Sequence, residues 1–363
     1  MKKRIIYMLV SSDLITDQRV LKVAGSCHRH GYEVHLAGRM LPFSAPINQP
    51  YDCIRKSLKF NNSFLFYAEL NIRFFWMLMR SHFDIVLAND TDTLPAARLA
   101  SMLKRKVLIF DAHELFPEVP ELQGRPRVKA FWERIENLIF PKLKNAYTVC
   151  DSIAKHYEKK YNINMQVVRN MPYFRAPHEK LLNYSPDRII LYQGALNTGR
   201  GLEWVIDAMP MVEKAVLVII GDGDIRKQLE ERARNAGLTS RVYFMGRISG
   251  SELYRYTSSA DVGLCLLEDQ GLSYYYALPN RIFDLIQAGV PVLATGFPEI
   301  RNIVQKHRTG LLTMSTQPSE IAKLLNRMLS EPMPVTHFPE LAKQFCWENE
   351  EKLLLRIIEN AVR

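Results

Sequence analysis

The residues best suited to chemistry are basic or glycine-rich and fall in four short segments of the second half of the chain. These segments are Gly194 to Gly201 with Arg200, Gly221-Asp222-Gly223, Gly246 to Ser249 with Arg247, and Pro279-Asn280-Arg281 with Asp284. Glycine lets a ligand approach the backbone closely, and arginine can pair with the oxygens of a diphosphate. A helix starting near Asn280, its expected N-cap, adds the partial positive charge of a helix N-terminus. The four segments therefore predict a site for a ligand that carries a diphosphate beside a hydroxyl-bearing group.

The elements that must position these segments are parallel strands. Apolar runs at residues 189–192, 215–220, 242–244 and 262–266 predict buried strands, and helical patterns separate them. The carboxyl ends of parallel strands meet at one edge of a sheet, where ligand contacts collect. We therefore expect the four segments to line one edge, as a ligand with a base, a ribose and a diphosphate would require.

The first half shows the same alternation, with predicted strands at residues 5–10, 32–37, 84–88, 107–110 and 146–150 and an irregular stretch at 38–60. No GxGxxG follows its first strand, so the usual dinucleotide fingerprint is absent. His113 lies beside Asp111 and Glu114 at a predicted strand end. This position predicts a functional histidine, with a satisfied loop histidine as the alternative.

Three acidic or basic groups of the first half allow two interpretations each. Asp17 and Arg19 could contact an acceptor or phosphates, or they could simply belong to a helix start. Asp90-Thr91-Asp92 imitates a metal-binding DxD motif, but every diphosphate feature lies in the other half. We therefore interpret that motif as a loop and helix cap, and we expect no metal.

Charge and composition limit the function classes. Residues 1–175 hold 27 Lys+Arg and 16 Asp+Glu, whereas the remainder holds 21 and 22, which sum to the net charge of +10. The basic half could meet an anionic membrane surface or a phosphorylated substrate; no nucleic-acid motif accompanies it, so no nucleic-acid partner is expected. The scattered cysteines favour a reducing, cytoplasmic compartment. Residues 64–79 predict an aromatic helix, either core-facing or dipping into a membrane interface.

Longer stretches resemble a known family. YQGALNTGRGLEWVIDAM, VIIGDGDIRKQL, VYFMGRIS and ALPNRIFDLIQAGVPVLAT resemble successive signatures of the retaining GT-B glycosyltransferases of group 1 (family 4). DQRVLKVAGSCHRHGYEVHLAGR, DIVLANDTDTLPAARLA and FDAHELFPEVP resemble its acceptor domain, and FCWENEEKLLLRIIENA its closing helix. The resemblance implies an α/β GT-B fold: two facing Rossmann-like domains, a cleft between them, and a helix crossing back. We expect domains at 1–172 (with helix 345–363) and 188–344, joined by a linker at 173–187.

The resemblance also implies residue roles. It assigns the diphosphate to the loop of Gly194, Asn197 and Arg200 and to the helix start at Pro279, Asn280 and Arg281. It assigns the base to Gly221, Asp222, Gly223, Arg247 and Ile248, the ribose to Asp284, and the transferred sugar to His113. Asp17, Arg19 and Asp90 would lie on the acceptor side, and His113, Arg200 and Arg281 would be catalytic. Two positions depart from the family pattern: Tyr276 replaces a glutamate, for which Glu268 or Asp269 could substitute, and Ala195 replaces a basic residue.

The resulting hypothesis is a retaining glycosyltransferase that moves a sugar from a UDP- or GDP-linked donor to an acceptor hydroxyl. A glycan or lipid-linked acceptor in polysaccharide biosynthesis is expected, with the enzyme cytoplasmic and peripheral at the inner membrane face. Beyond the nucleotide-sugar co-substrate we expect no cofactor. The alternatives are a nucleotide-sugar 2-epimerase and a non-catalytic nucleotide-sugar-binding protein.

Overall fold

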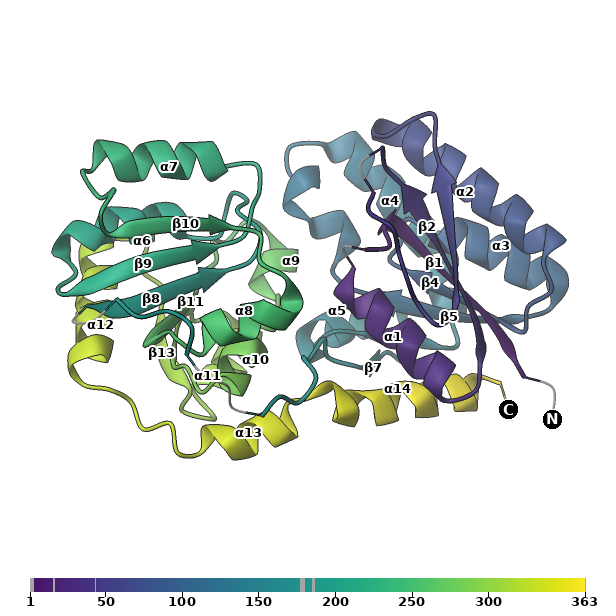
Figure 1. Ribbon diagram of the computed structural model, residues 1–363. Helices are drawn as coiled ribbons and strands as arrows, with labels where there is room; N and C mark the ends of the chain where they lie inside the picture. The colour runs from purple at the N-terminus through teal and green to yellow at the C-terminus, as the bar shows by residue number, and fades with distance from the viewer. Residues whose placement is uncertain (1–2, 16, 43, 177–179, 185–186, 363) are drawn as a thin grey trace. The chain divides into compact units, whose positions relative to one another are not determined.

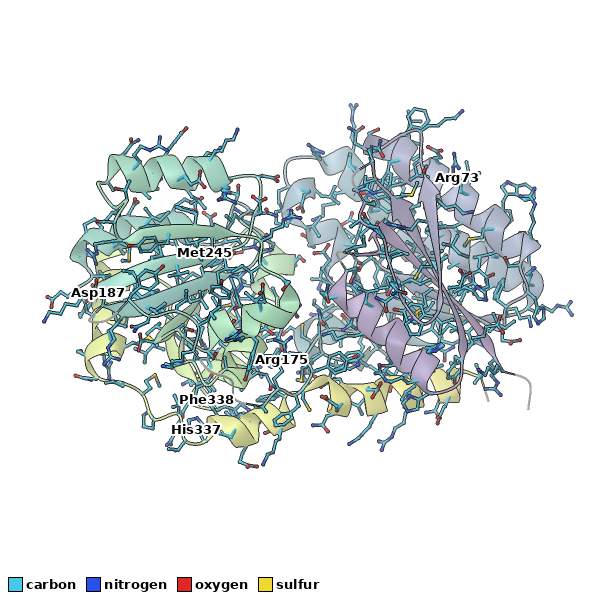
Figure 2. All side chains as sticks on the ribbon, viewed as in Figure 1. Arg73, Arg175, Asp187, Met245, His337 and Phe338 are labelled. Carbon is cyan, nitrogen blue, oxygen red and sulfur yellow. The ribbon has the colours of Figure 1, made fainter. Side chains whose placement is uncertain are left out.

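A computed structural model describes residues 3–15, 17–42, 44–176, 180–184 and 187–362. The chain divides into two compact units, with boundaries between Asn170 and Met171 and between Asn349 and Glu350. Each unit holds one parallel sheet flanked by helices (Figure 1), which confirms the predicted α/β class. The predicted linker 173–187 falls within the second unit. There the backbone N–H of Arg175, labelled in Figure 2, donates to Gln287 Oε1 (3.1 Å).

The first unit is built on a seven-stranded sheet in the order β3-β2-β1-β4-β5-β6-β7. Its strands are β1 (Ile5–Asp13), β2 (Glu33–Met40), β3 (Asp52–Ser57), β4 (Ile85–Asn89), β5 (Val107–Ala112), β6 (Ala146–Thr148) and β7 (Gln166–Val167). Its helices are α1 (Gln18–Arg29), α2 (Ser63–Arg80), α3 (Leu94–Lys104), α4 (Pro126–Ile139), α5 (Asp151–Tyr161) and most of α14 (Trp347–Ala361). Every residue of β4 is buried, as expected for a central parallel strand covered on both faces.

The second unit holds a six-stranded parallel sheet in the order β10-β9-β8-β11-β12-β13. Its strands are β8 (Arg188–Gln193), β9 (Ala215–Ile220), β10 (Val242–Gly246), β11 (Val262–Cys265), β12 (Val292–Thr295) and β13 (Gly310–Thr313). Its helices are α6 (Leu202–Ala208), α7 (Arg226–Asn235), α8 (Gly250–Thr257), α9 (Leu272–Tyr275), α10 (Asn280–Gln287), α11 (Pro298–Val304), α12 (Pro318–Ser330) and α13 (Phe338–Gln344). Chain order reverses between β8 and β11, which makes the carboxyl end of this pair the switch point.

Two local predictions are wrong. The stretch 38–60 is not wholly irregular, because it contains β3, a half-exposed edge strand with the polar sequence DCIRKS and no apolar run to announce it. Asn280 is not the N-cap of its helix. Pro279 holds that position in extended backbone, so Asn280 is already the first helical residue.

Helix α2 confirms the core-facing interpretation of the aromatic stretch. Phe66, Leu70, Phe74 and Leu78 are buried against the unit, as a core-facing helix requires. The opposite side also carries large apolar residues, and these are exposed. Within the described ranges, no helix has the length and apolar character needed to cross a bilayer.

Candidate functional site

The four segments predicted to bind a ligand lie together at the carboxyl edge of the sheet of the second unit, where backbone hydrogen bonds join three of them. The N–H of Gly194 donates to Ile220 O (3.0 Å), and the N–H of Leu196 donates to Asp222 O (3.1 Å). The N–H of Gly221 donates to Gly246 O (2.8 Å). Three loops that are distant in sequence therefore form one continuous backbone surface, and the start of α10 joins them through Arg281.

Glycine is required where these loops cross. Gly221 has φ +141°, and a Cβ there would lie 1.9 Å from the carbonyl oxygen of Gly194. A Cβ at Gly223 would lie 2.6 Å from Leu196 O and 2.7 Å from Asn197 Oδ1. The absence of a Cβ at these two positions is what lets the two loops approach each other so closely.

Arg281 supplies a buried positive charge at the start of α10. Its guanidinium lies over the Tyr192 ring (4.4 Å to the centroid), and a Cβ at Gly194 would be 3.1 Å from Nη2. The Nη1 atom is buried and has no hydrogen-bond partner. A buried N–H donor without a partner costs about 1–3 kcal/mol, so the site gains stability when an acceptor such as a phosphate oxygen arrives.

Arg200 occupies the glycine-containing loop in a similar way. Its guanidinium lies over the Tyr274 ring (4.9 Å), and its Nε is buried without a hydrogen-bond partner. The loop after β11 covers this segment: the N–H of Glu268 donates to Gly199 O (3.0 Å). Glu268 therefore lies next to the loop of Arg200, whereas Tyr276 contacts the Tyr275 ring (5.4 Å).

Asp284 stands one turn along α10 and is held by a buried polar chain. Gln193 Nε2 donates to Asp284 Oδ2 (3.2 Å), and the hydroxyl of Thr257 donates to Gln193 Oε1 (2.6 Å). This chain orients the carboxylate from the end of β8, in a position suited to accept hydrogen bonds from hydroxyl groups.

The residues predicted to contact the base are more exposed to solvent. Arg247 is largely exposed, and its Nε lies 3.8 Å from Asp222 Oδ2. Ile248 is half-buried beside it. The Arg247 side chain is exposed, whereas the backbone of its loop is held in place by the hydrogen bond from Gly221 to Gly246 O.

The predicted acceptor-side residues of the first unit form a different arrangement, a partly buried chain of alternating charges. Arg19 donates twice to Asp111, from Nε (2.9 Å) and from Nη2 (2.7 Å). His113 lies between two carboxylates, with Nε2 3.2 Å from Asp111 and Nδ1 3.2 Å from Asp90. Asp90 also accepts the backbone N–H of His113 (2.8 Å).

These contacts decide the charge state of the histidine. Burial alone would lower the pKa of His113, but Asp90 and Asp111 outweigh it, and its pKa is raised well above the ordinary value. The pKa of Asp111 falls to about 2 because Arg19 and His113 outweigh its burial. The two carboxylates therefore favour the protonated imidazolium of His113, a form that donates hydrogen bonds and is unsuited to act as a general base.

The structure also tests the cap interpretations of Asp17 and of the Asp90-Thr91-Asp92 motif. Asp17 is the N-cap of α1 and accepts the N–H of Val20 (3.1 Å), so the helix-start interpretation of Asp17 is confirmed. The cap interpretation of the DxD motif is wrong, because Thr93 is the N-cap of α3 and no side-chain cap bond forms. Burial and Asp90 raise the pKa of Asp92 to about 7.

Sequence reasoning missed several supporting residues. Tyr192 and Tyr274 support the two arginines, and Gln193 holds Asp284. Asp111 was predicted beside His113, but its link to Arg19 was not. The only available signal was position, since Gln193 ends β8 and Asp111 lies in β5 at the same edge of its own sheet.

Comparison with known proteins places both halves of the chain. Residues 17–171 match a family model described as Glycosyltransferase Family 4, and residues 187–331 match one described as Glycosyl transferases group 1. A curated relative, the uncharacterized glycosyltransferase MJ1607 of Methanocaldococcus jannaschii, is 27% identical over 184 residues, covering 48% of this chain and 46% of its own. The matches span less than half the length of the first curated relatives.

Solved structures share the fold over nearly the whole chain. Sucrose-phosphate synthase from Thermosynechococcus elongatus has a TM-score of 0.81 at 16% identity, covering 99% of each chain. Anabaena HepE in complex with UDP-glucose has a TM-score of 0.73 at 14% identity, covering 98% of this chain and 99% of its own.

Proposed function

This chain belongs to the group 1 glycosyltransferase family, with the GT-B pair of Rossmann-like domains, and from that premise we propose that it transfers a sugar from a nucleoside diphosphate sugar to an acceptor hydroxyl. One observation carries the proposal: two arginines, Arg200 and Arg281, hold buried N–H donors without partners at the edge where four loops meet. A diphosphate supplies the missing acceptors.

The arrangement supports specific roles for the chain's own residues. Negative charge grows on the leaving diphosphate as the glycosidic bond breaks, and Arg200, Arg281 and the start of α10 would stabilise it without a metal ion. Asp284 would hold the ribose hydroxyls. His113, protonated between Asp90 and Asp111, would donate a hydrogen bond to the sugar or acceptor. The leaving phosphate would then accept the acceptor's proton, a front-face route that retains the anomeric configuration.

The acceptor and location are inferred from the first unit. Its basic surface supports an anionic acceptor such as a lipid-linked glycan, with the enzyme peripheral at the inner membrane face. The fold-level likeness to HepE with UDP-glucose makes UDP sugars the first donors to try, before GDP sugars.

Turnover of a nucleotide-sugar panel, with and without a membrane extract, tests the proposal. Nucleotide release that requires the extract is expected. Conversion of the sugar without extract would instead indicate an epimerase, and binding without turnover in both conditions would indicate a non-catalytic protein. The anomeric configuration of the product, read by NMR, tests retention separately.

A further inference from the structure

The first unit carries an exposed apolar surface on two neighbouring helices. Three residues of α2, Leu65, Ile72 and Trp76, share one side of the helix opposite its buried face and are 50%, 59% and 52% exposed. Spacings of seven and four residues place them in one stripe. Helix α3 lies beside α2 (Figure 1) and adds Leu99, Met102 and Leu103, which are 43%, 54% and 55% exposed. We call these six side chains the α2–α3 surface.

A basic hollow lies at the carboxyl-terminal ends of the same two helices. It is an open cavity of about 440 Å³ whose lining includes Lys3, Arg4, His82, Arg105 and Lys106. His82 stands two residues beyond α2, and Arg105 is the C-cap of α3, two residues after Leu103. Lys104 joins the two helix ends by donating to Leu78 O (3.0 Å) and to Ser81 O. The hollow and the α2–α3 surface are therefore continuous along the chain.

The hollow keeps an excess of positive charge. Among the described residues that line it, the one carboxylate is that of Asp84, which accepts the N–H of Ile5 (3.0 Å) and the ammonium of Lys106 (3.1 Å). Among the described residues, no ion pair forms to Lys3, Arg4 or Arg105. Several cations around a cavity with one engaged carboxylate can receive one or more phosphate groups.

The charge of the exposed helices adds to this pattern. Arg80 lies with its guanidinium 5.2 Å from the Trp76 ring centre, and Arg73, labelled in Figure 2, pairs with Glu69 at 2.7 Å. Aromatic and basic side chains together are typical of helices that lie in a membrane interface. A second copy of this chain is a poorer occupant, because it would place two sets of cations against each other.

We propose that the α2–α3 surface and the basic hollow together bind an anionic phospholipid membrane, with the apolar side chains among the headgroups and the hollow holding lipid phosphates. This inference rests on the proposed function only in that a lipid-linked acceptor would lie in such a membrane. It assigns the contact to a defined face of the first unit, at the opposite end of β1, β4 and β5 from His113.

Vesicle co-sedimentation of the full chain, without any sugar donor, tests the proposal. Binding is expected to phosphatidylcholine vesicles that contain phosphatidylglycerol, and to be much weaker with phosphatidylcholine alone. Arg4→Gln with Arg105→Asn is expected to weaken binding by roughly 10-fold or more, at about fivefold per cation. Asparagine suits the left-handed backbone of Arg105 (φ 54°). Trp76→Gln with Leu103→Gln is expected to reduce binding at every lipid composition.

Matched controls remove the same chemistry elsewhere on the first unit. Lys142→Gln with Lys155→Gln removes two exposed cations, and Leu138→Gln removes a side chain that is 67% exposed on α4. Both should bind vesicles like the wild type. The inference is overturned if the two double variants of the hollow and of the α2–α3 surface bind vesicles as the controls do. It is also overturned if the chain binds inorganic phosphate but not vesicles. A third contrary outcome is that Trp76→Gln with Leu103→Gln converts a dimer to a monomer without changing vesicle binding. Vesicle binding by a chain without transferase activity would contradict the proposed function and leave this inference standing.

Discussion

The two units share a parallel-sheet plan but treat charge in opposite ways. The first holds 29 Lys+Arg and 19 Asp+Glu, and the second holds 19 of each, so the first accounts for the whole net charge of +10. At the carboxyl edges of the two sheets, by contrast, it is the second unit that holds cations without a carboxylate partner among the described residues. In the first unit Arg19 and His113 form ion pairs with Asp111 and Asp90, whereas in the second Arg200 and Arg281 lie on aromatic rings, and each has a buried N–H donor without a hydrogen-bond partner.

This difference suggests different roles for the charged groups of the two units: fixed positions in the first and binding of an anion in the second. A paired, buried charge network fixes positions and contributes to folding, so removing one partner leaves an uncompensated charge. A buried cation supported by an aromatic ring keeps its charge available for an incoming anion. The comparison therefore predicts that substitutions in the first unit act mainly on stability and those in the second mainly on turnover.

The largest effect is expected from Asp111→Asn. It leaves Arg19 and His113 without their shared carboxylate, which should cost about 3–5 kcal/mol of unfolding free energy. Urea denaturation followed by circular dichroism measures this. A midpoint equal to that of the wild type would contradict the stabilising role of the pair.

Next in size is Arg200→Ala, which should lower kcat/KM about 10²–10³-fold, because a positive charge on the leaving diphosphate is lost. Arg281→Ala should behave similarly. The melting temperature of Arg200→Ala is expected to stay close to that of the wild type, in contrast with Asp111→Asn. Unchanged turnover would remove the diphosphate assignment, and Arg247→Ala is the control at an exposed position of the same edge.

A third effect, of up to about 4 kcal/mol, is expected in the pH dependence of stability. Burial raises the pKa of Asp92 from 3.8 to about 7, so between these values the folded chain holds a proton that the unfolded chain lacks. That stabilisation is complete below about pH 4 and is lost as the pH rises through 7. Asp111 has the opposite sign: its pKa of about 2 gives stability above about pH 4 that is lost as the pH falls.

Asp92→Asn separates the two contributions, because the amide cannot ionise. Unfolding free energy measured from pH 4 to pH 8 should decline less steeply in this variant than in the wild type. Identical slopes would show that Asp92 does not titrate in this range.

The smallest effect is expected at Tyr274, the ring beneath Arg200. Tyr274→Leu removes a cation–π contact of about 0.5–2 kcal/mol and should lower kcat/KM by about 2- to 30-fold. Tyr274→Phe keeps the ring and should retain most activity. Equal losses in both variants would point to the hydroxyl rather than to support of the guanidinium.

The fold was predictable wherever strands were apolar and buried. Residues 215–220 were predicted as a strand and form β9 with the same bounds, because six buried apolar residues leave little ambiguity. Short edge elements such as β3, β13 and α13 were missed, since half-exposed strands and a short helix lack a periodic apolar signal.

The candidate site was predictable as a set of loops but not as a set of contacts. Parallel topology brings the four loops to one edge, which the order of strands and helices already implies. The link between Arg19 and Asp111 spans 92 positions and depends on packing that no local pattern encodes. The same is true of the contact between Arg200 and Tyr274. Tyr274 lies on α9, a helix of four residues that the sequence did not indicate.

The path of the chain makes the second unit an insertion within the first. It leaves the first unit after Asn170 and returns at Glu350, within α14. The two ends of the insertion are tied, since the N–H of Trp347 donates to Pro172 O (2.7 Å), and the flanking ends are tied as well, since the N–H of Arg169 donates to Glu350 Oε2 (2.7 Å). A gene fragment for residues 171–349 would thus encode the whole second unit as one continuous segment. The first unit, by contrast, can be made alone only by joining its two segments, so that Asn170 is followed directly by Glu350.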